Sequence, residues 1–361
     1  MNTIYIRTLK RAEHTVFCVA DGQKTYYDSQ FKKYIPFSSG QQVKRSLIDA
    51  LCEAINQAPS PTTFISKVVG SKEKKDIDEG EVYGTCDPTY ADQLFGGWMR
   101  ATKAIEGEKK TKTLKRRSPL SISAMRALHP LLAGVEKEAG TFDRRERSNN
   151  IVIVKDEKGN ELSDEEIVQI LDGKDRSLSL KWLKPSDRVA GLFVMDIAID
   201  LRRLFSVSLN SFEPEMSDST IEKLINGGWI KSENVFGQCL VAPKELRTKW
   251  IIGLAKAIVE WRITSNQSRT FSLMDTLAIS ISNNANLIAG SIRAKLSEED
   301  SKKADPIIDE DLKGVETFIA LQAGGFIHTK GETVDALEKA EQKLIDLMMN
   351  FDYENQLVVN S

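Results

Sequence analysis

Long apolar runs are missing from this sequence. No stretch approaches the ~18 consecutive apolar residues that a membrane-spanning helix requires. The N-terminal segment MNTIYIRTLKRAEH also lacks the apolar core of a signal peptide. We therefore expect a cytoplasmic protein without a membrane partner. With 361 residues, of which 41% are hydrophobic and 28% charged, the chain is expected to form one large elaborated domain or two domains.

Cysteine and histidine are scarce and scattered. Four cysteines and three histidines occur without a C-x-x-C pair, so the sequence predicts neither a zinc site nor a disulfide framework. Cys18 lies in the apolar run VFCVA and Cys52 lies near an apolar helix stripe, and both are expected to be reduced thiols in the core. We predict no cofactor and no resident metal.

Motifs of the common catalytic sites are absent as well. The chain contains no G-x-x-x-x-G-K-[ST], no G-x-G-x-x-G, no G-x-S-x-G and no H-E-x-x-H. Nucleotide-hydrolase and dinucleotide-binding interpretations therefore lack their usual support. We predict a protein that is not an enzyme.

A few isolated side chains leave alternatives open. Asp196 and Asp200 project from the same side of one predicted strand and could hold Mg²⁺, although a structural role at the strand end is favoured. Asp21 and Asp28 lie in the loop after the first strand, where a nuclease could place an acid. His129 is predicted to pack in the core rather than to act as a base.

Charge is distributed unevenly along the chain. Residues 100–147 carry thirteen Lys and Arg against six Asp and Glu, whereas residues 295–361 carry seven against fifteen. One face can therefore attract a polyanion although the formal net charge is only −2. The acidic C-terminal region could dock on the basic stretch of the same chain or of a neighbouring copy.

The longest periodic segments alternate between strands and helices. We predict strands at 3–19, 189–209 and 271–282, and helices beginning near Gly40, at 91–105, at Ser118 and at 244–263. The acidic region 291–361 is predicted to be helical, with helices near 311–322 and 332–349. This order is typical of an α+β sandwich of the ferredoxin-like type, in which helices cover one face of an antiparallel sheet and leave the other face free to bind.

Two of the predicted helices begin beside clusters of basic residues. In SSGQQVKRS, Ser39 and Gln42 form the S-x-x-Q variant of a capping box, and Lys44 with Arg45 opposes the helix dipole. An anion would supply the missing charge, so this helix start is a candidate phosphate site. A solvated capped helix is the alternative. The segment KKTKTLKRRSP places cations before the second helix in the same way.

Base-stacking aromatics are not evident on the predicted central strand. The segment RVAGLFVM offers Phe193 but lacks the second aromatic of an RNA-recognition motif. We therefore expect any RNA binding to depend on phosphates and shape rather than on reading of bases.

Four segments together resemble a known family. They are SSGQQVKRSLIDAL, KRRSPLSISAMRALHP, LFVMDIAIDL and SNQSRTFSLMD, in this order. The chain resembles, from residue 3 to about 285, the DevR-type backbone subunit of type I CRISPR effector complexes (Cascade), which polymerises along the guide RNA. The resemblance implies a modified RRM palm at residues 1–58 and 186–290, a finger region at 59–185 and a thumb near 205–245.

The resemblance also implies site residues and partners. The residues that match the guide-binding segments are Arg7, Gly40, Gln41, Gln42, Lys44, Arg45, Arg116, Arg117, Ser118, Arg126 and Arg269. The implied partners are the crRNA, target DNA paired to it, further copies of the chain, and the cap and large subunits of Cascade, in a helical filament that serves antiviral defence. Two alternatives stay open: a type III-like backbone subunit that cleaves target RNA with Asp21 or Asp28, and an RNA-binding scaffold unrelated to CRISPR.

Overall fold

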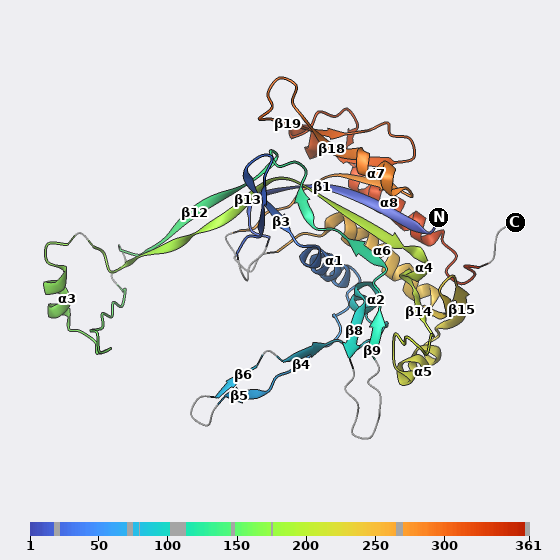
Figure 1. Cartoon of the computed structure of the whole chain (residues 1–361), viewed down its shortest axis with the longest axis horizontal. Coiled ribbons are helices and arrows are strands. Elements are labelled where there is room, and N and C mark those ends of the chain that lie inside the picture. The colour runs from blue at the N-terminus through green and yellow to red at the C-terminus, as the bar shows by residue number, and fades with distance from the viewer. Residues whose placement is uncertain are drawn as a thin grey trace. The chain divides into compact units, whose positions relative to one another are not determined.

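The computed structural model describes residues 1–17, 22–70, 75–78, 80–101, 113–145, 149–174, 176–264 and 270–357. The chain divides into two compact units, one made of Met1–Gly134 with Val189–Ser361 and the other of Val135–Arg188 (Figure 1). The fold is α+β, with one large mixed sheet and smaller strand pairs. In the described part of the chain, no helix is long and apolar enough to cross a membrane.

The first unit is built on the large sheet. Its strands are β1 (Thr3–Thr15), β2 (Thr25–Asp28), β3 (Lys33–Ser38), β10 (Leu120–Ile122), β11 (Met125–Ala127), β13 (Leu180–Asp200), β17 (Thr276–Ser282), β20 (Glu316–Ala320) and β21 (Glu332–Thr333). They lie in the order β2-β3-β11-β13-β1-β17-β20-β21, and β10 pairs with β13 beside this path. The neighbours β11, β13, β1 and β17 are antiparallel to one another.

The strand predicted at 189–209 is confirmed for residues 189–200, as part of β13, and the strand predicted at 271–282 is confirmed for residues 276–282, as β17. Val194 and Met195 are both almost fully buried although they point to opposite faces of β13, and every residue of β17 is buried. Both faces of these strands are therefore covered, which explains their nearly continuous apolar sequence. The predicted strand at 189–209 ends earlier than expected, because the Asp200 side chain accepts a hydrogen bond from the Arg202 amide and starts the short helix α4 (Leu201–Leu204).

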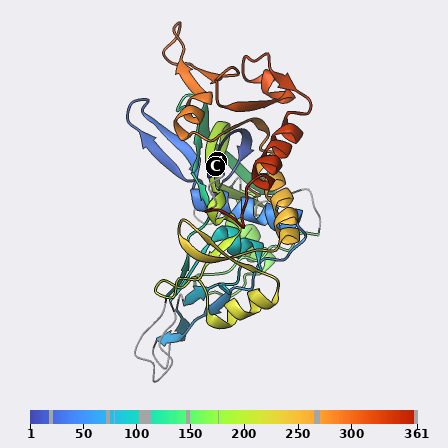
Figure 2. The same cartoon turned by 90° about the vertical axis from the view of Figure 1, so that its right-hand side faces the viewer.

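Helices cover one face of the sheet. They are α1 (Gly40–Ala54), α6 (Lys244–Glu260) and α8 (Ala336–Met349). Figure 2 shows α6 and α8 side by side. Helix α1 packs closely on α6 at Gly253, where an added Cβ would overlap the Ile55 side chain. The buried residues of α1 include Val43, Leu47 and Leu51, as the apolar spacing predicts.

The second face of the sheet is only partly free, which corrects the expectation of an open face. A separate apolar cluster that includes Leu9, Leu277 and Ile319 lies on it. The covering elements come from the C-terminal region: α7 (Ala285–Ser291), β18 (Ile292–Leu296), β19 (Ala304–Ile308) and the 3₁₀ helix Leu321–Gly325. The prediction that 291–361 is helical was therefore wrong except for α8. The expected helix near 311–322 is β20 followed by the 3₁₀ turn, because Ile319 joins this cluster as a strand residue beside Ala278 of β17.

The prediction of a helix from Ser118 was also wrong. Residues 120–127 form the short strands β10 and β11, which pair with β13. The spacing of Leu120, Ile122 and Met125 fits a helix, but alternation in strands also buries Leu120 and leaves Ser121 exposed. The helix expected at 91–105 is confirmed only for its first turns, as α2 (Ala91–Gly96), because Gly97 adopts a φ of 74° and ends it.

Smaller elements surround this core. They are β4 (Thr63–Ile65), β5 (Val68–Gly70), β6 (Lys75–Ile77), β7 (Glu81–Tyr83), β8 (Trp98–Ala101), β9 (Thr113–Arg116), β14 (Ser206–Ser208), α5 (Asp218–Asn226), β15 (Ile230–Asn234) and β16 (Gly237–Val241). β4 pairs with β7, β5 with β6 and β8 with β9, whereas β14, β16 and β15 form a three-stranded sheet.

The second unit is a strand pair that carries a small helical segment. Strand β12 (Ala133–Asp143) pairs with β13, and Arg188 forms a 2.7 Å ion pair with Glu138. Helix α3 (Asp164–Leu171) begins with a complete capping box of Ser163 and Glu166. Residues 156–160 form a turn that is closed by an isolated bridge between Lys155 and Glu161.

Candidate nucleic-acid interface

A strip of polar and aromatic side chains crosses the uncovered part of the second sheet face. It consists of Tyr26 on β2, Phe37 on β3, Arg126 on β11, Asp196 on β13 and Arg7 on β1, and we call it the aromatic–arginine strip. Phe37 lies directly opposite Arg126 in the strand register, and Arg7 lies opposite Asp196. Directly opposed residues of an antiparallel pair point to the same face. The register therefore places these side chains on one surface.

The centre of the strip holds two arginines around one carboxylate. Arg126 donates a hydrogen bond of 2.7 Å to Asp196 Oδ2, and Arg7 Nε lies 3.6 Å from Asp196 Oδ1. Ser123 completes the arrangement, because its hydroxyl accepts hydrogen bonds from the Asp196 amide and from Arg126. Two positive charges against one negative charge leave this cluster with one net positive charge. Arg126 is 40% exposed, so part of that charge faces solvent.

Arg7 is the less accessible of the two arginines. Its side chain is 12% exposed and donates a 3.1 Å hydrogen bond to the Ala289 carbonyl of α7. Burial lowers the pKa of Arg7, while Asp196 opposes this shift and Arg126 adds to it. Beside Arg7, a groove of about 420 Å³ runs between the sheet and α7, with Tyr5, Ser121 and Ile288 in its walls. Arg7 therefore anchors the strip, and Arg126 presents its charge.

The aromatic end of the strip lies at the sheet edge. The rings of Tyr26 and Phe37 have centroids 6.1 Å apart, and Tyr26 is 43% exposed. Burial raises the pKa of the Tyr26 phenol, Asp28 raises it further, and Arg126 lowers it. Tyr26 thus lies within electrostatic range of Arg126, although the two come from strands separated by β3.

The predicted phosphate site at the start of α1 is largely filled by the protein itself. Ser39 caps the helix by accepting a hydrogen bond from the Gln42 amide, whereas the Gln42 side chain donates to Ser46 rather than closing a capping box. A Cβ at Gly40 would lie 2.9 Å from the Ile122 carbonyl oxygen. The close approach that Gly40 permits is therefore an approach of β10, and Gln41 is the exposed residue of this turn.

The two cations of this helix start point to protein partners. Lys44 donates a 2.9 Å hydrogen bond to the Gly96 carbonyl at the end of α2, and its burial lowers its pKa. Arg45 is 70% exposed and forms a 2.8 Å ion pair with Asp49 one turn later. Neither cation joins the aromatic–arginine strip.

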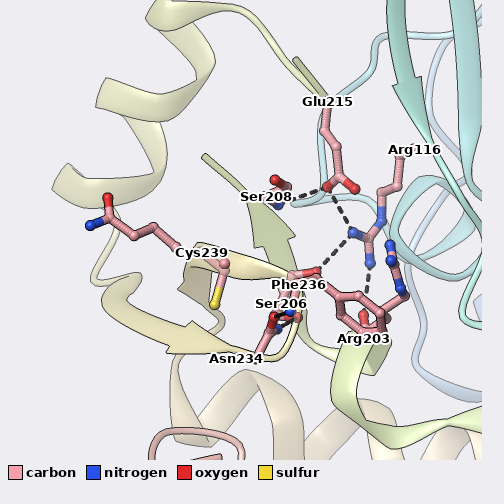
Figure 3. A pocket seen from close by; sticks show the side chains of 10 residues that line it. Arg116, Arg203, Ser206, Ser208, Glu215, Asn234, Phe236 and Cys239 are labelled. Carbon is pink, nitrogen blue, oxygen red and sulfur yellow. Dashed lines mark hydrogen bonds and ion pairs between the residues drawn. The ribbon is translucent and has the colours of Figure 1, made fainter. Parts of the chain in front are cut away.

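Arg116 lies in the interior (Figure 3). Its side chain is 1% exposed, forms a 3.0 Å ion pair with Glu215, and donates to the carbonyls of Ser206 and Arg203. The Ser118 hydroxyl bonds to the Phe95 and Leu120 carbonyls, and Arg117 is exposed. Arg116 and Ser118 therefore link β9 and the residues after it to neighbouring elements, and they are not part of the aromatic–arginine strip.

The remaining predicted residues are distributed as follows. Arg269, Asp21, Cys18 and the basic run 102–112 lie outside the described residues. Asp28 accepts a hydrogen bond from the Phe31 amide and shapes the β2–β3 turn. Asp200 pairs with Arg202, and Asp196 is held by the two arginines. Among the described residues, no group of three or more His, Cys, Asp or Glu side chains is placed to hold a metal ion.

Sequence reasoning missed Tyr26 and Phe37. The polar segment DGQKTYYDSQFKKYIPFSSG, residues 21–40 with three lysines and three tyrosines, predicts a loop. The alternation in KTYYD and KYIPF was the available signal, since β2 and β3 form a hairpin from these segments. The aromatics that the central strand lacks are supplied by this edge hairpin.

Comparisons with known proteins give matches among solved structures alone. No family model matches the chain, and no curated protein matches it. Two solved chains are similar at 10% sequence identity. One is described as "CRISPR RNA-guided surveillance complex", with a TM-score of 0.39 over 96% of this chain and 84% of that chain. The other is described as "CRISPR RNA-guided surveillance complex, pre-nicking", with a TM-score of 0.41 over 96% and 89%. Similarity at this level does not establish a shared family.

Proposed function

We propose that this protein is a guide-RNA-binding backbone subunit of a type I CRISPR effector complex. The observation that carries the RNA-binding part is the aromatic–arginine strip, in which a net positive charge lies beside the exposed Tyr26 and the half-buried Phe37 on the uncovered part of the second sheet face. The sequence resemblance described above supplies the CRISPR part. A single-stranded nucleic acid offers both phosphates and base faces, which are the two chemistries that such a strip fits.

We further propose that the core is a modified RRM-like palm. The elements β1, α1, β11, β13, α6 and β17 follow the βαββαβ order of a ferredoxin-like fold. Their strand order, β11-β13-β1-β17 with antiparallel neighbours, supports this assignment. Helices α1 and α6 lie on one face, so the proposed RNA lies on the opposite face. The hairpins at 63–83 and the unit 135–188 fall within the proposed finger region.

The proposal includes the partners that the resemblance implies. Repeated copies bind along one crRNA in the cytoplasm and present it to target DNA, with cap and large subunits at the ends and along the filament. The subunit itself holds RNA and is not an enzyme. Binding that depends on charge and stacking suits a guide of variable sequence, because neither interaction selects one base.

Stoichiometry tests the backbone role. We expect the number of bound copies to rise stepwise as single-stranded RNA is lengthened, measured by native mass spectrometry on the full-length protein. RNA that co-purifies with the protein should be sequenced in parallel, and CRISPR repeat-derived ends are expected. One bound copy at every RNA length would instead favour the monomeric scaffold.

The nuclease alternative is tested separately. A type III-like subunit would cleave a target RNA paired to the guide in the presence of Mg²⁺, and Asp21→Ala or Asp28→Ala would abolish cleavage. We expect the target RNA to stay intact. The structure favours a turn-forming role for Asp28, whose carboxylate is already bonded to the Phe31 amide at 2.8 Å.

A further inference from the structure

The β2–β3 hairpin carries aromatic pairs on both of its faces. Tyr26 contacts Phe37 at 6.1 Å between centroids, and Tyr27 contacts Tyr34 at 5.3 Å. Tyr26 and Tyr27 are consecutive in a strand, so they point to opposite faces. Their exposed fractions are similar, at 43% for Tyr26 and 54% for Tyr27. The hairpin therefore presents two comparable aromatic surfaces in different electrostatic surroundings.

Only the Tyr26 surface is tied to the arginine cluster by the strand register. Phe37 lies opposite Arg126 on β11, and Tyr26 is an electrostatic neighbour of Arg126. Asp28 is also near Tyr26, but its carboxylate is engaged by the Phe31 amide. An exposed ring beside an arginine places a stacking surface next to a phosphate-binding group.

The Tyr26 side chain stays partly open to solvent beside Phe37, with 43% of the residue exposed. Their planes are inclined at 58°, so the two rings are not stacked face to face. Phe37 is half-buried between β2 and β11 and lies opposite Arg126 in the strand register. Tyr26 is thus held by its neighbour while its outer side stays accessible.

We propose that Tyr26, supported by Phe37, is a platform on which a base of the bound RNA stacks while Arg126 holds an adjacent phosphate. This inference rests on the proposed function and names the residue that supplies its stacking surface. Stacking of this kind accepts any base, since every base has a π face. It also explains why aromatic side chains are placed on the exposed edge of a sheet, where they gain little from the core.

Variants of the two hairpin faces test the platform with an internal control. Single-stranded RNA carrying 2-aminopurine is titrated against the full-length protein and against Tyr26→Leu, Tyr26→Phe and Tyr34→Leu. We expect Tyr26→Leu to weaken binding roughly five- to hundred-fold, the range for loss of one stacked base, and to abolish part of the fluorescence quenching. Tyr26→Phe, which keeps the ring, should bind as the unchanged protein does. Tyr34→Leu removes a ring of 66% exposure from the opposite face and should leave affinity unchanged.

The salt dependence separates stacking from phosphate binding. Tyr26→Leu should lower affinity without changing the slope of log affinity against log salt, because an aromatic ring releases no counterion. Equal losses in Tyr26→Leu and Tyr34→Leu, or unchanged affinity in Tyr26→Leu, would overturn the platform while the proposed function stands. A change in oligomeric state without a change in RNA affinity would also overturn it, since the patch would then be a protein contact. Absence of RNA binding by the unchanged protein would overturn the proposed function itself.

Discussion

Arg126 donates a 2.7 Å hydrogen bond to Asp196, and this bond joins β11 to β13 across 70 residues of sequence. The contact holds a partly exposed guanidinium in a fixed orientation on the uncovered part of the second sheet face. Because Arg7 lies on the other side of the same carboxylate, Asp196 does not cancel the positive charge of the cluster. The strip therefore holds an ordered positive charge beside aromatic rings, and its effect on RNA binding can be measured.

Removal of the Arg126 charge should change both the strength and the salt dependence of RNA binding. We expect Arg126→Gln to weaken binding and to reduce the slope of log affinity against log salt by about 0.7, the contribution of one neutralised phosphate in a single strand. Arg45→Gln is the matched comparison, because Arg45 is more exposed but already paired with Asp49. Its effect should stay within about twofold, as for most surface ion pairs. A larger loss of RNA affinity in Arg45→Gln than in Arg126→Gln would indicate that the RNA binds at the start of α1.

Loss of the Arg116 side chain should destabilise the protein. Arg116 and Glu215 form a buried ion pair with exposed fractions of 1% and 7%, and removal of one partner leaves the other charge buried and unpaired. We expect Arg116→Met to lower the free energy of unfolding by roughly 3–5 kcal/mol, measured by urea denaturation. Arg116→Met with Glu215→Leu should recover part of this loss. Unchanged stability in the single variant would mean that Arg116 is solvated and available to RNA.

Gly40→Ala tests why the glycine is present in the first turn of α1. Helix propensity alone favours alanine by about 1 kcal/mol. The new Cβ would meet the Ile122 carbonyl oxygen at 2.9 Å, and forced packing of this kind typically costs about 1–3 kcal/mol. We expect a net loss of stability in thermal denaturation. Gly96→Ala, where nothing lies within 4 Å of the added Cβ, is the control and should not destabilise.

Lys10 should give the protein a characteristic dependence of stability on pH. The ammonium is buried, donates to the Trp261 carbonyl and the Thr276 hydroxyl, and lies 4.8 Å from the Trp261 ring centroid. The pKa of Lys10 is lowered to about 7, mainly by burial, with Arg262 adding to the shift and Asp275 opposing it. The unfolded chain keeps a pKa of about 10.4. Between these values the unfolded state binds the additional proton, so the Lys10 contribution to stability rises with pH from about 7 to 10.

Lys10→Met isolates this contribution. We expect the difference in unfolding free energy between Lys10→Met and the unchanged protein to favour the variant at pH 7 and to shrink as pH rises toward 10. The change should not exceed about 1.4 kcal/mol per pH unit, the value for one proton. A difference that stays constant over this range would show that Lys10 has an ordinary pKa in the folded protein.

The sequence was a good guide wherever burial on both sides determined the structure. The apolar residues of β13, β17 and the α1 stripe are stable only when they are buried in the core. The sequence was a poor guide where contacts between distant segments determine the local structure.

Residues 120–127 have a spacing that fits a helix, but they form strands that pair with β13. Gly40 allows the close approach of β10 rather than of an anion. Lys44 donates to the Gly96 carbonyl, which is 52 residues away in the sequence, so local patterns do not predict this contact. Phe37 lies opposite Arg126 only because β3 pairs with β11, and no local pattern encodes that pairing.

Photo-crosslinking locates the RNA most directly. Single-stranded RNA substituted with 4-thiouridine is bound to the full-length protein, irradiated, and the crosslinked peptides are identified by mass spectrometry. The account predicts crosslinks in residues 25–38 and 120–127, which contain Tyr26, Phe37 and Arg126. Crosslinks confined to residues 135–188 and 205–245, with the strip unmarked, would contradict it.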